Sequence, residues 1–208
     1  DGHNRNGDKE WTSQGKVVEA EPGRSFVFQC SMYDFHFSTW GYRIEPTETG
    51  CRVTEWSEDL RPESALEFSK KMSGVDDRAE RNRHTISGTL DRLADQVRPR
   101  LGGSGEHAAK ATALLGFLLQ DEGFRGNTTE YEDPRNSFLN EVLDRRMGIP
   151  ITLAVVILEV CRRAGVEAQG VAFPGHFLVR SPAPNGLFIA DPFEGRLLTQ
   201  ADLRNLLS

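Results

Sequence analysis

The sequence has few cysteines and no long apolar run, and both features narrow the class of protein. Its three cysteines, Cys30, Cys51 and Cys161, are scattered, form no metal-type pair and make no even disulfide set. No apolar run approaches the roughly 20 residues of a membrane-spanning helix, so we expect no membrane span. The net charge of −6 comes from 31 acidic and 25 basic residues, and it excludes the basic footprint of a nucleic-acid-binding protein.

Metal-ligand spacing is also absent. The histidines are isolated from one another and from the cysteines, so we expect no metal and no cofactor.

The first ten residues do not form a signal peptide, which makes the cytoplasm the expected location. Arginine outnumbers lysine twenty to five, which suggests a bacterial source. With 38% hydrophobic and 27% charged residues, the 208-residue chain suits one large or two small globular domains.

Alternating apolar residues predict an antiparallel meander in the first half. The expected strands are 16–20, 25–30, 36–44 and 51–57, separated by turn residues such as Pro22-Gly23. Residues 1–10 are expected to fray, and 58–74 to be irregular. A helix is predicted over 75–97, where apolar residues recur with a helical period and form one stripe. We expect that stripe to pack on the meander.

This half resembles the C-terminal part of the START-like superfamily, also called SRPBCC, which includes polyketide cyclases and lipid carriers. The resemblance rests on Trp11, the Val17-Val18-Glu19-Ala20 run, Pro22-Gly23-Arg24, the Phe26/Phe28 strand, Trp40, Gly50 and the closing helix. It implies a partial helix-grip fold, in which a curved antiparallel sheet grips a long C-terminal helix around an apolar cavity. The family's first strand and its two short helices are absent. Phe28, Trp40 and Tyr42 could line the cavity, although ordinary core packing is the stronger hypothesis.

A glycine-rich stretch at 102–105 predicts a flexible linker. We therefore expect two domains, 1–97 and 107–208, joined by residues 98–106. The second contains a helix over 151–163 that is apolar on nearly every side and is therefore expected to be buried. Pro150 suits its first turn, and Gly165 its end.

Three short strands are predicted after this helix, at 168–173, 176–181 and 186–191. Turn residues between Pro182 and Gly186 predict a hairpin of the last two strands. In a hairpin centred on that link, His176 lies opposite Asp191, and the carboxylate could fix the imidazole tautomer. A register slip of one residue would separate them.

The second half resembles the transglutaminase-like superfamily, whose fold is a papain-like α+β core. That family's pattern of Cys, Ala and Gly along the buried helix falls on Pro150, Ala154 and Gly165, and its His and Asp fall on His176 and Asp191. Pro150 therefore occupies the nucleophile position. Cys161 lies about three helical turns away and cannot readily substitute.

More narrowly, the chain resembles the bacterial SirB-type branch, which lacks the cysteine in the same way and whose activity is not established. The motifs are NSFLNEVLDRRMGIPITL, VAFPGHFLVR and the turn at Asp191-Pro192-Phe193. A related module occurs in an F-box protein of ubiquitin ligases. The resemblance covers about 108–208.

Several site residues have two interpretations. His176 and Asp191 form either a retained acid–base pair or, the stronger hypothesis, an inherited structural hydrogen bond. Thr152 could replace the nucleophile, or its hydroxyl could bond a backbone carbonyl in the first helical turn. Four further residues could line a cleft mouth, or act as caps and solvated charges: Asn136, Glu141, Arg145 and Arg146.

These observations favour a pseudoenzyme, a catalytically silent transglutaminase-like module that binds a protein or peptide partner. An alternative from another class is a carrier or enzyme for a small apolar ligand, such as a lipid or polyketide, that acts through the START-like half. A second alternative is a residual hydrolase or transferase that uses His176 and Asp191.

Overall fold

A large antiparallel sheet organises the computed structural model, which describes residues 2–6, 9–73, 78–102, 107–183 and 186–207. The strands are β1 (Gly2–Asn6), β2 (Lys9–Glu21), β3 (Ser25–Met32), β4 (Phe35–Thr47), β5 (Gly50–Asp59), β6 (Arg125–Gly126), β7 (Met147–Gly148), β8 (Gln169–Phe173), β9 (His176–Ala183), β10 (Gly186–Asp191) and β11 (Arg196–Leu198). The helices are α1 (Glu63–Ser73), α2 (Arg78–Val97), η1 (Arg98–Leu101), α3 (His107–Gly116), η2 (Phe117–Asp121), η3 (Pro134–Asn136), α4 (Leu139–Arg145), α5 (Pro150–Ala164) and α6 (Gln200–Asn205). The predicted α+β class is confirmed.

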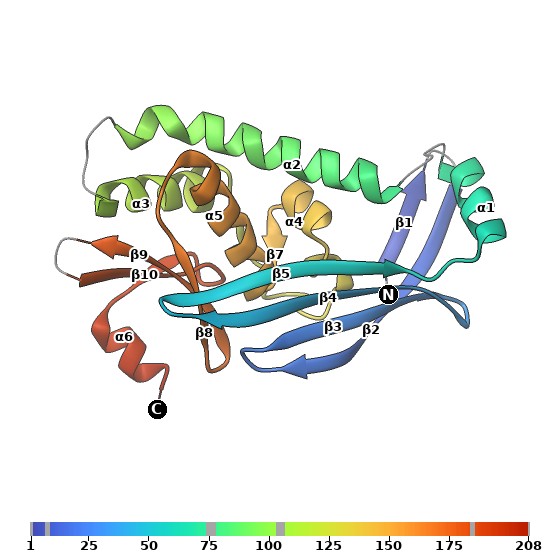
Figure 1. Ribbon diagram of the computed structural model, residues 1–208, viewed down its shortest axis with the longest axis horizontal. Helices are drawn as coiled ribbons and strands as arrows, with labels where there is room; N and C mark the ends of the chain where they lie inside the picture. Colours follow the sequence, from blue (N-terminus) through green and yellow to red (C-terminus); the bar gives the residue numbers. More distant parts are fainter. Residues whose placement is uncertain (1, 7–8, 74–77, 103–106, 184–185, 208) are drawn as a thin grey trace.

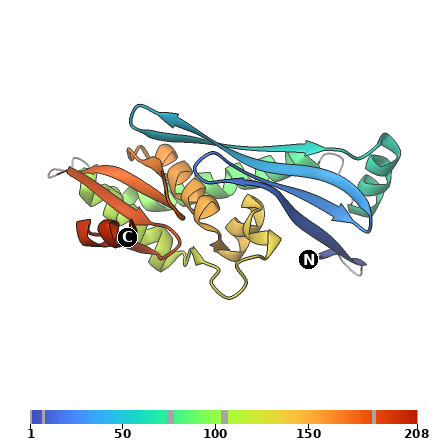
Figure 2. The ribbon, with the colours of Figure 1, turned by 90° about the horizontal axis from the view of Figure 1, so that it is seen from below.

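The nine-stranded sheet contains strands from both halves of the chain, in the order β1-β2-β3-β4-β5-β8-β9-β10-β11. The long strands β2 to β5 form the predicted meander, and β8 joins it through the pairing of Cys51 with Gly170. Helices α4 and α5 lie on one side of the meander, and α2 runs along them (Figures 1 and 2). None of the described helices is both long and apolar enough to cross a membrane.

Two segments at the ends of the meander are more regular than expected. Residues predicted to fray include β1, which pairs with β2 from Gly2↔Ser13 to Asn6↔Lys9. The segment predicted as irregular contains α1, whose first turn carries Glu63 and whose last turn carries lysines, as the helix dipole favours. Pairing with β2 therefore orders the first segment, and charges that suit the helix dipole favour a helix in the second, although both segments are polar.

Helix α5 lies at the centre of the core. Eight of its residues are buried: Ile151, Thr152, Leu153, Ala154, Val156, Ile157, Val160 and Cys161. Helix α2 packs mainly against α5 and α4, so the expectation that it would pack on the meander was wrong. Polar contacts support this packing, since Arg163 Nε donates to Asp91 Oδ1 at 2.8 Å and Arg98 Nη2 to the Arg163 carbonyl at 2.8 Å.

The inner face of the meander is filled instead by the segment before and within α4. The Phe138 ring makes edge contacts with Phe28 and Trp40, at centroid distances of 5.2 Å and 5.3 Å. The fully buried Tyr42 donates its hydroxyl hydrogen to the Ser137 carbonyl at 2.7 Å. One buried apolar cluster therefore spans residues from both halves. The division into domains 1–97 and 107–208 stays a prediction, and linker residues 103–106 lie outside the described residues.

Replacing Tyr42 with phenylalanine tests the contact between the halves. The hydroxyl also lies 3.1 Å from Glu55 Oε1, so its loss leaves two acceptors without this donor. We expect Tyr42→Phe to lower the free energy of unfolding by about 1–3 kcal/mol, measured by urea denaturation. Tyr33→Phe is the matched control, because Tyr33 is 89% exposed. Equal stabilities of the two variants would show that the Tyr42 bond does not join the halves.

Candidate functional site

The site begins where α5 begins. Ile149 is extended, with φ −90° and ψ 166°, and Pro150 follows as the first helical residue, where its missing N–H costs no helical bond. The helix ends at Gly165, whose φ of 73° favours glycine. The buried body of the helix thus fixes the place of Pro150 at its N-terminus.

His176 and Asp191 lie together on the sheet, as predicted, although the register differs. Strands β9 and β10 pair Ala190 with Val179 and Ile189 with Arg180, a slip of two residues from the predicted hairpin. The difference arises because β9 continues through Pro182 to Ala183, beyond the last pairing of β8. A slip of two keeps every side chain on its face. His176 Nδ1 therefore still lies 3.1 Å from Asp191 Oδ2.

Asp191 is held firmly in this position. It is 1% exposed, and its Oδ1 accepts hydrogen bonds from the backbone N–H of Phe193 at 2.9 Å and of Glu194 at 3.1 Å. The remaining oxygen is left for His176. Because the carboxylate only accepts, His176 Nδ1 must be the donor, which directs the other ring nitrogen away from Asp191. The imidazole side chain is 30% exposed.

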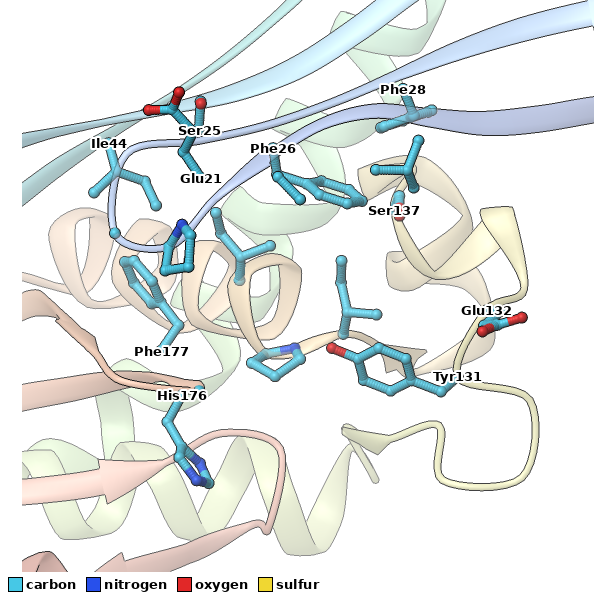
Figure 3. A pocket seen from close by; sticks show the side chains of 18 of the residues that line it. Glu21, Ser25, Phe26, Phe28, Ile44, Tyr131, Glu132, Ser137, His176 and Phe177 are labelled. Atoms are coloured by element: carbon cyan, nitrogen blue, oxygen red, sulfur yellow. The ribbon is translucent and has the colours of Figure 1, made fainter. Parts of the chain in front are cut away.

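His176 and Pro150 line one pocket of about 550 Å³ (Figure 3). Its walls come from the β2–β3 hairpin, from the start of α5 and from the turn between β8 and β9. The apolar lining residues are Val17, Ala20, Pro22, Phe26, Phe28, Ile44, Pro134, Ile149, Pro150, Ile151, Phe173 and Phe177. A concave, mostly apolar space with a few polar groups is typical of ligand sites.

Tyr131 is a pocket residue that the sequence interpretation missed, because it treated 126–134 only as a polar loop. The buried Asn136 fixes this loop by donating to the carbonyls of Glu130 and Tyr131, at 2.7 Å and 3.1 Å. The Tyr131 ring makes an edge contact with Phe193 at 5.7 Å and projects into the pocket (Figure 3). Partial burial raises the pKa of the Tyr131 hydroxyl. An aromatic residue in an otherwise polar loop was the available clue.

Other predicted site residues lie elsewhere. Thr152 is fully buried, and its hydroxyl lies 2.9 Å from the Asn136 carbonyl and 3.0 Å from the Ile149 carbonyl. Arg146 pairs with Glu122 at 3.0 Å and does not line the pocket. Glu141 and Trp40 line a second cavity of about 260 Å³. Asn136 holds the loop from a buried position, and Tyr42 is part of the core.

The pocket offers an acid–base pair but no activated nucleophile among the described residues. Two serines line the pocket. The hydroxyl of Ser25 donates a hydrogen bond to Glu19, and Ser137 is buried, with 7% of its surface exposed. Neither hydroxyl bonds to His176 in the described structure, although nucleophile and base must lie within hydrogen-bond reach. Burial raises the pKa of Cys161 to about 12 and that of Cys30 to about 11, so both are thiols at neutral pH.

The sequence that builds this site matches a known protein family. A family model described as the transglutaminase-like superfamily matches residues 84–208, more than half of the chain. The chain belongs to the transglutaminase-like superfamily. No solved structure matches it significantly.

Parts of longer curated proteins are similar to this chain. A UPF0162 protein of Xylella fastidiosa is 52% identical over 96 residues, which are 46% of this chain and 34% of the relative. A UPF0162 protein of Pseudomonas aeruginosa is 37% identical over 118 residues, 57% and 43% of the two chains. Human F-box only protein 21 is 39% identical over 67 residues, 32% and 11% of the two chains. The chain thus spans less than half the length of each of these relatives.

The hydrogen bond to Asp191 predicts the tautomer of His176. The neutral ring should carry its hydrogen on Nδ1, which leaves Nε2 as the acceptor. Long-range ¹H–¹⁵N NMR correlation spectra of the neutral ring will identify the protonated nitrogen. The Asp191→Asn variant is the control, because an amide can donate to Nδ1 and favour the other tautomer. A ring protonated on Nε2 in the unmodified protein would contradict the geometry.

Proposed function

We propose that this chain is a catalytically silent transglutaminase-like module that binds a protein or peptide partner in the pocket between the β2–β3 hairpin and α5. One observation carries the proposal. Pro150 stands at the N-terminus of α5 in the same pocket as His176. In the family pattern this position belongs to the nucleophilic cysteine, and proline has no nucleophilic atom.

The remaining features of the pocket support binding over chemistry. Its walls are mostly apolar, and Tyr131 and His176 add polar groups to the lining. The His176 side chain is 30% exposed, so a ligand can reach it. A triad's rate depends on its members acting together, so His176 and Asp191 alone contribute little to acyl transfer. Their hydrogen bond instead stabilises the turn at Asp191, which carries Phe193 and through it Tyr131.

A second candidate function is the binding of a small apolar ligand, such as a lipid or polyketide, through the first half, whose sequence resembles part of a START-like domain. One observation favours it: the meander supplies part of the apolar wall of the pocket, through Phe26, Phe28 and Ile44. The volume of about 550 Å³ lies within the range of roughly 300–1,000 Å³ typical of ligand pockets. Native mass spectrometry of protein from cell extract separates the two candidates: a bound small apolar mass favours the second, and a co-purified polypeptide favours the first.

The absence of catalysis can be measured directly. We expect purified protein to release no ammonia from a glutamine peptide mixed with a primary amine, and to cleave no casein, above the level of the His176→Ala variant. The physical reason is the missing nucleophile beside His176. Turnover that disappears in His176→Ala would overturn the proposal and favour a residual hydrolase or transferase.

A thiol introduced at Pro150 tests the alignment on which the proposal rests. In a Cys30→Ser, Cys51→Ser background, Pro150→Cys should remain folded, because no interior backbone bond depends on this proline. The helix N-terminus and the nearby His176 should favour the thiolate. We expect iodoacetamide to react faster with this thiol than with Cys161, whose pKa burial raises to about 12.

The His176→Ala variant in the same background is the control, and its excess rate should be reduced, because only the helix N-terminus still favours the thiolate. A folded Pro150→Cys protein that reacts no faster than free cysteine at neutral pH would show that position 150 does not correspond to the family nucleophile.

A further inference from the structure

Strand β2 has an open edge beside the pocket. β1 pairs with β2 only over Lys9–Ser13, whereas β3 pairs with it over Gln14–Glu21 on the opposite side. Within the described residues, no strand lies beside the other edge of β2 from Gln14 to Glu21, and this part of β2 borders the sheet in Figure 1. Unpaired backbone N–H and C=O groups along such an edge can bond an additional strand.

The open edge leads directly into the pocket. Four of its residues line the pocket: Gly15, Val17, Ala20 and Glu21. A β-bulge between Val17 and Glu19 places Val17 opposite Phe28 and Ala20 opposite Phe26, so both short apolar side chains lie on the pocket side. Val17 and Val18 are 53% and 47% exposed. Lys16 and Glu19 flank these two valines on the same edge.

The charges around the pocket indicate what could pair there. Among the described residues that line the pocket, those with a formal charge are all acidic, namely Glu21, Glu132 and Asp133. Asp133 is already paired with Arg135 and Arg145, at 2.7 Å and 3.2 Å. Glu21 reaches only a distant, exposed partner in Arg24, at 3.9 Å. Glu19 and Glu21 alternate with Ala20, whose side chain faces the pocket, so they lie on the opposite face of β2, toward which basic side chains of an added strand would also point.

We propose that the open edge of β2 accepts an extended segment of a partner protein as an added strand, whose apolar side chains alternate with lysine or arginine. The partner's backbone would bond to residues 14–21, and every second side chain would enter the apolar pocket toward Pro150 and His176. In this mode of recognition, main-chain hydrogen bonds supply affinity and pockets for alternate side chains supply specificity. The inference rests on the binding function proposed above and names the chemistry and the docking mode of its partner.

The probe is a short, blocked, fluorescein-labelled peptide in which lysine and valine alternate, measured with the full chain by fluorescence anisotropy. Two derivatives carry backbone N-methyl groups on all valines or on all lysines. In an added strand, these two sets of N–H groups point to opposite sides. We expect one methylated peptide to bind about tenfold or more weakly and the other to bind like the parent, because several backbone hydrogen bonds are lost in only one of them. A peptide that alternates glutamate with valine should bind more weakly than the parent.

Two variants locate the site. Val17→Asn removes an apolar contact without adding charge and should weaken binding of the parent peptide, and Leu187→Asn, at a similarly exposed leucine on β10, should leave it unchanged. Equal binding of the parent and both methylated peptides would overturn strand addition and leave peptide binding by side chains intact. No binding by any of them would overturn the inference, whereas the turnover and thiol measurements on the proposed function would be unaffected. A concentration-dependent dimer in sedimentation that Val17→Asn abolishes would assign the edge to a second copy of the chain and also overturn the inference.

Discussion

The burial of α5 is the constraint on which the rest of the structure depends. A helix with apolar residues on nearly every side needs cover from all directions, and no single neighbour can supply it. Here α2 and α4 cover it on one side, and β9 lies against it on another. Arg163 near its C-terminus is tied to α2 through Asp91. Once the helix is enclosed in this way, its N-terminus can lie in only one place, which is the wall of the pocket at Pro150.

The polar part of the site depends on a second constraint, the anchoring of Asp191. Two backbone N–H groups hold one carboxylate oxygen, and the other oxygen remains for His176. The same turn carries Phe193, whose ring packs against Gly126 and contacts Tyr131. The hydrogen bonds of Asp191 thus connect the sheet to the loop that closes the far side of the pocket. His176 and Asp191 therefore belong to the contacts that hold this turn in place.

Much of this architecture could be predicted from local patterns. The apolar run of α5 and its flanking Pro150 and Gly165 defined the helix, and turn chemistry predicted the hairpin that carries His176 and Asp191. The predicted register was wrong by two residues, yet the pair survived because side chains alternate with a period of two. The packing of α2 on α5, the filling of the meander by Phe138 and the position of Tyr131 could not be predicted. Each depends on contacts between residues far apart in the sequence, and periodicity shows only that an apolar face needs a partner.

The central claim is that the meander and α5 share one core and enclose the pocket between them. Hydrogen exchange followed by mass spectrometry tests it most directly, because backbone amides exchange slowly only where their hydrogen bonds stay closed. The shared core predicts strong protection in strands of residues 16–57 together with protection in 150–191, lost together as urea is raised. Rapid exchange throughout 16–57 beside a protected 150–191 would contradict the claim, since the pocket would then lack its meander wall.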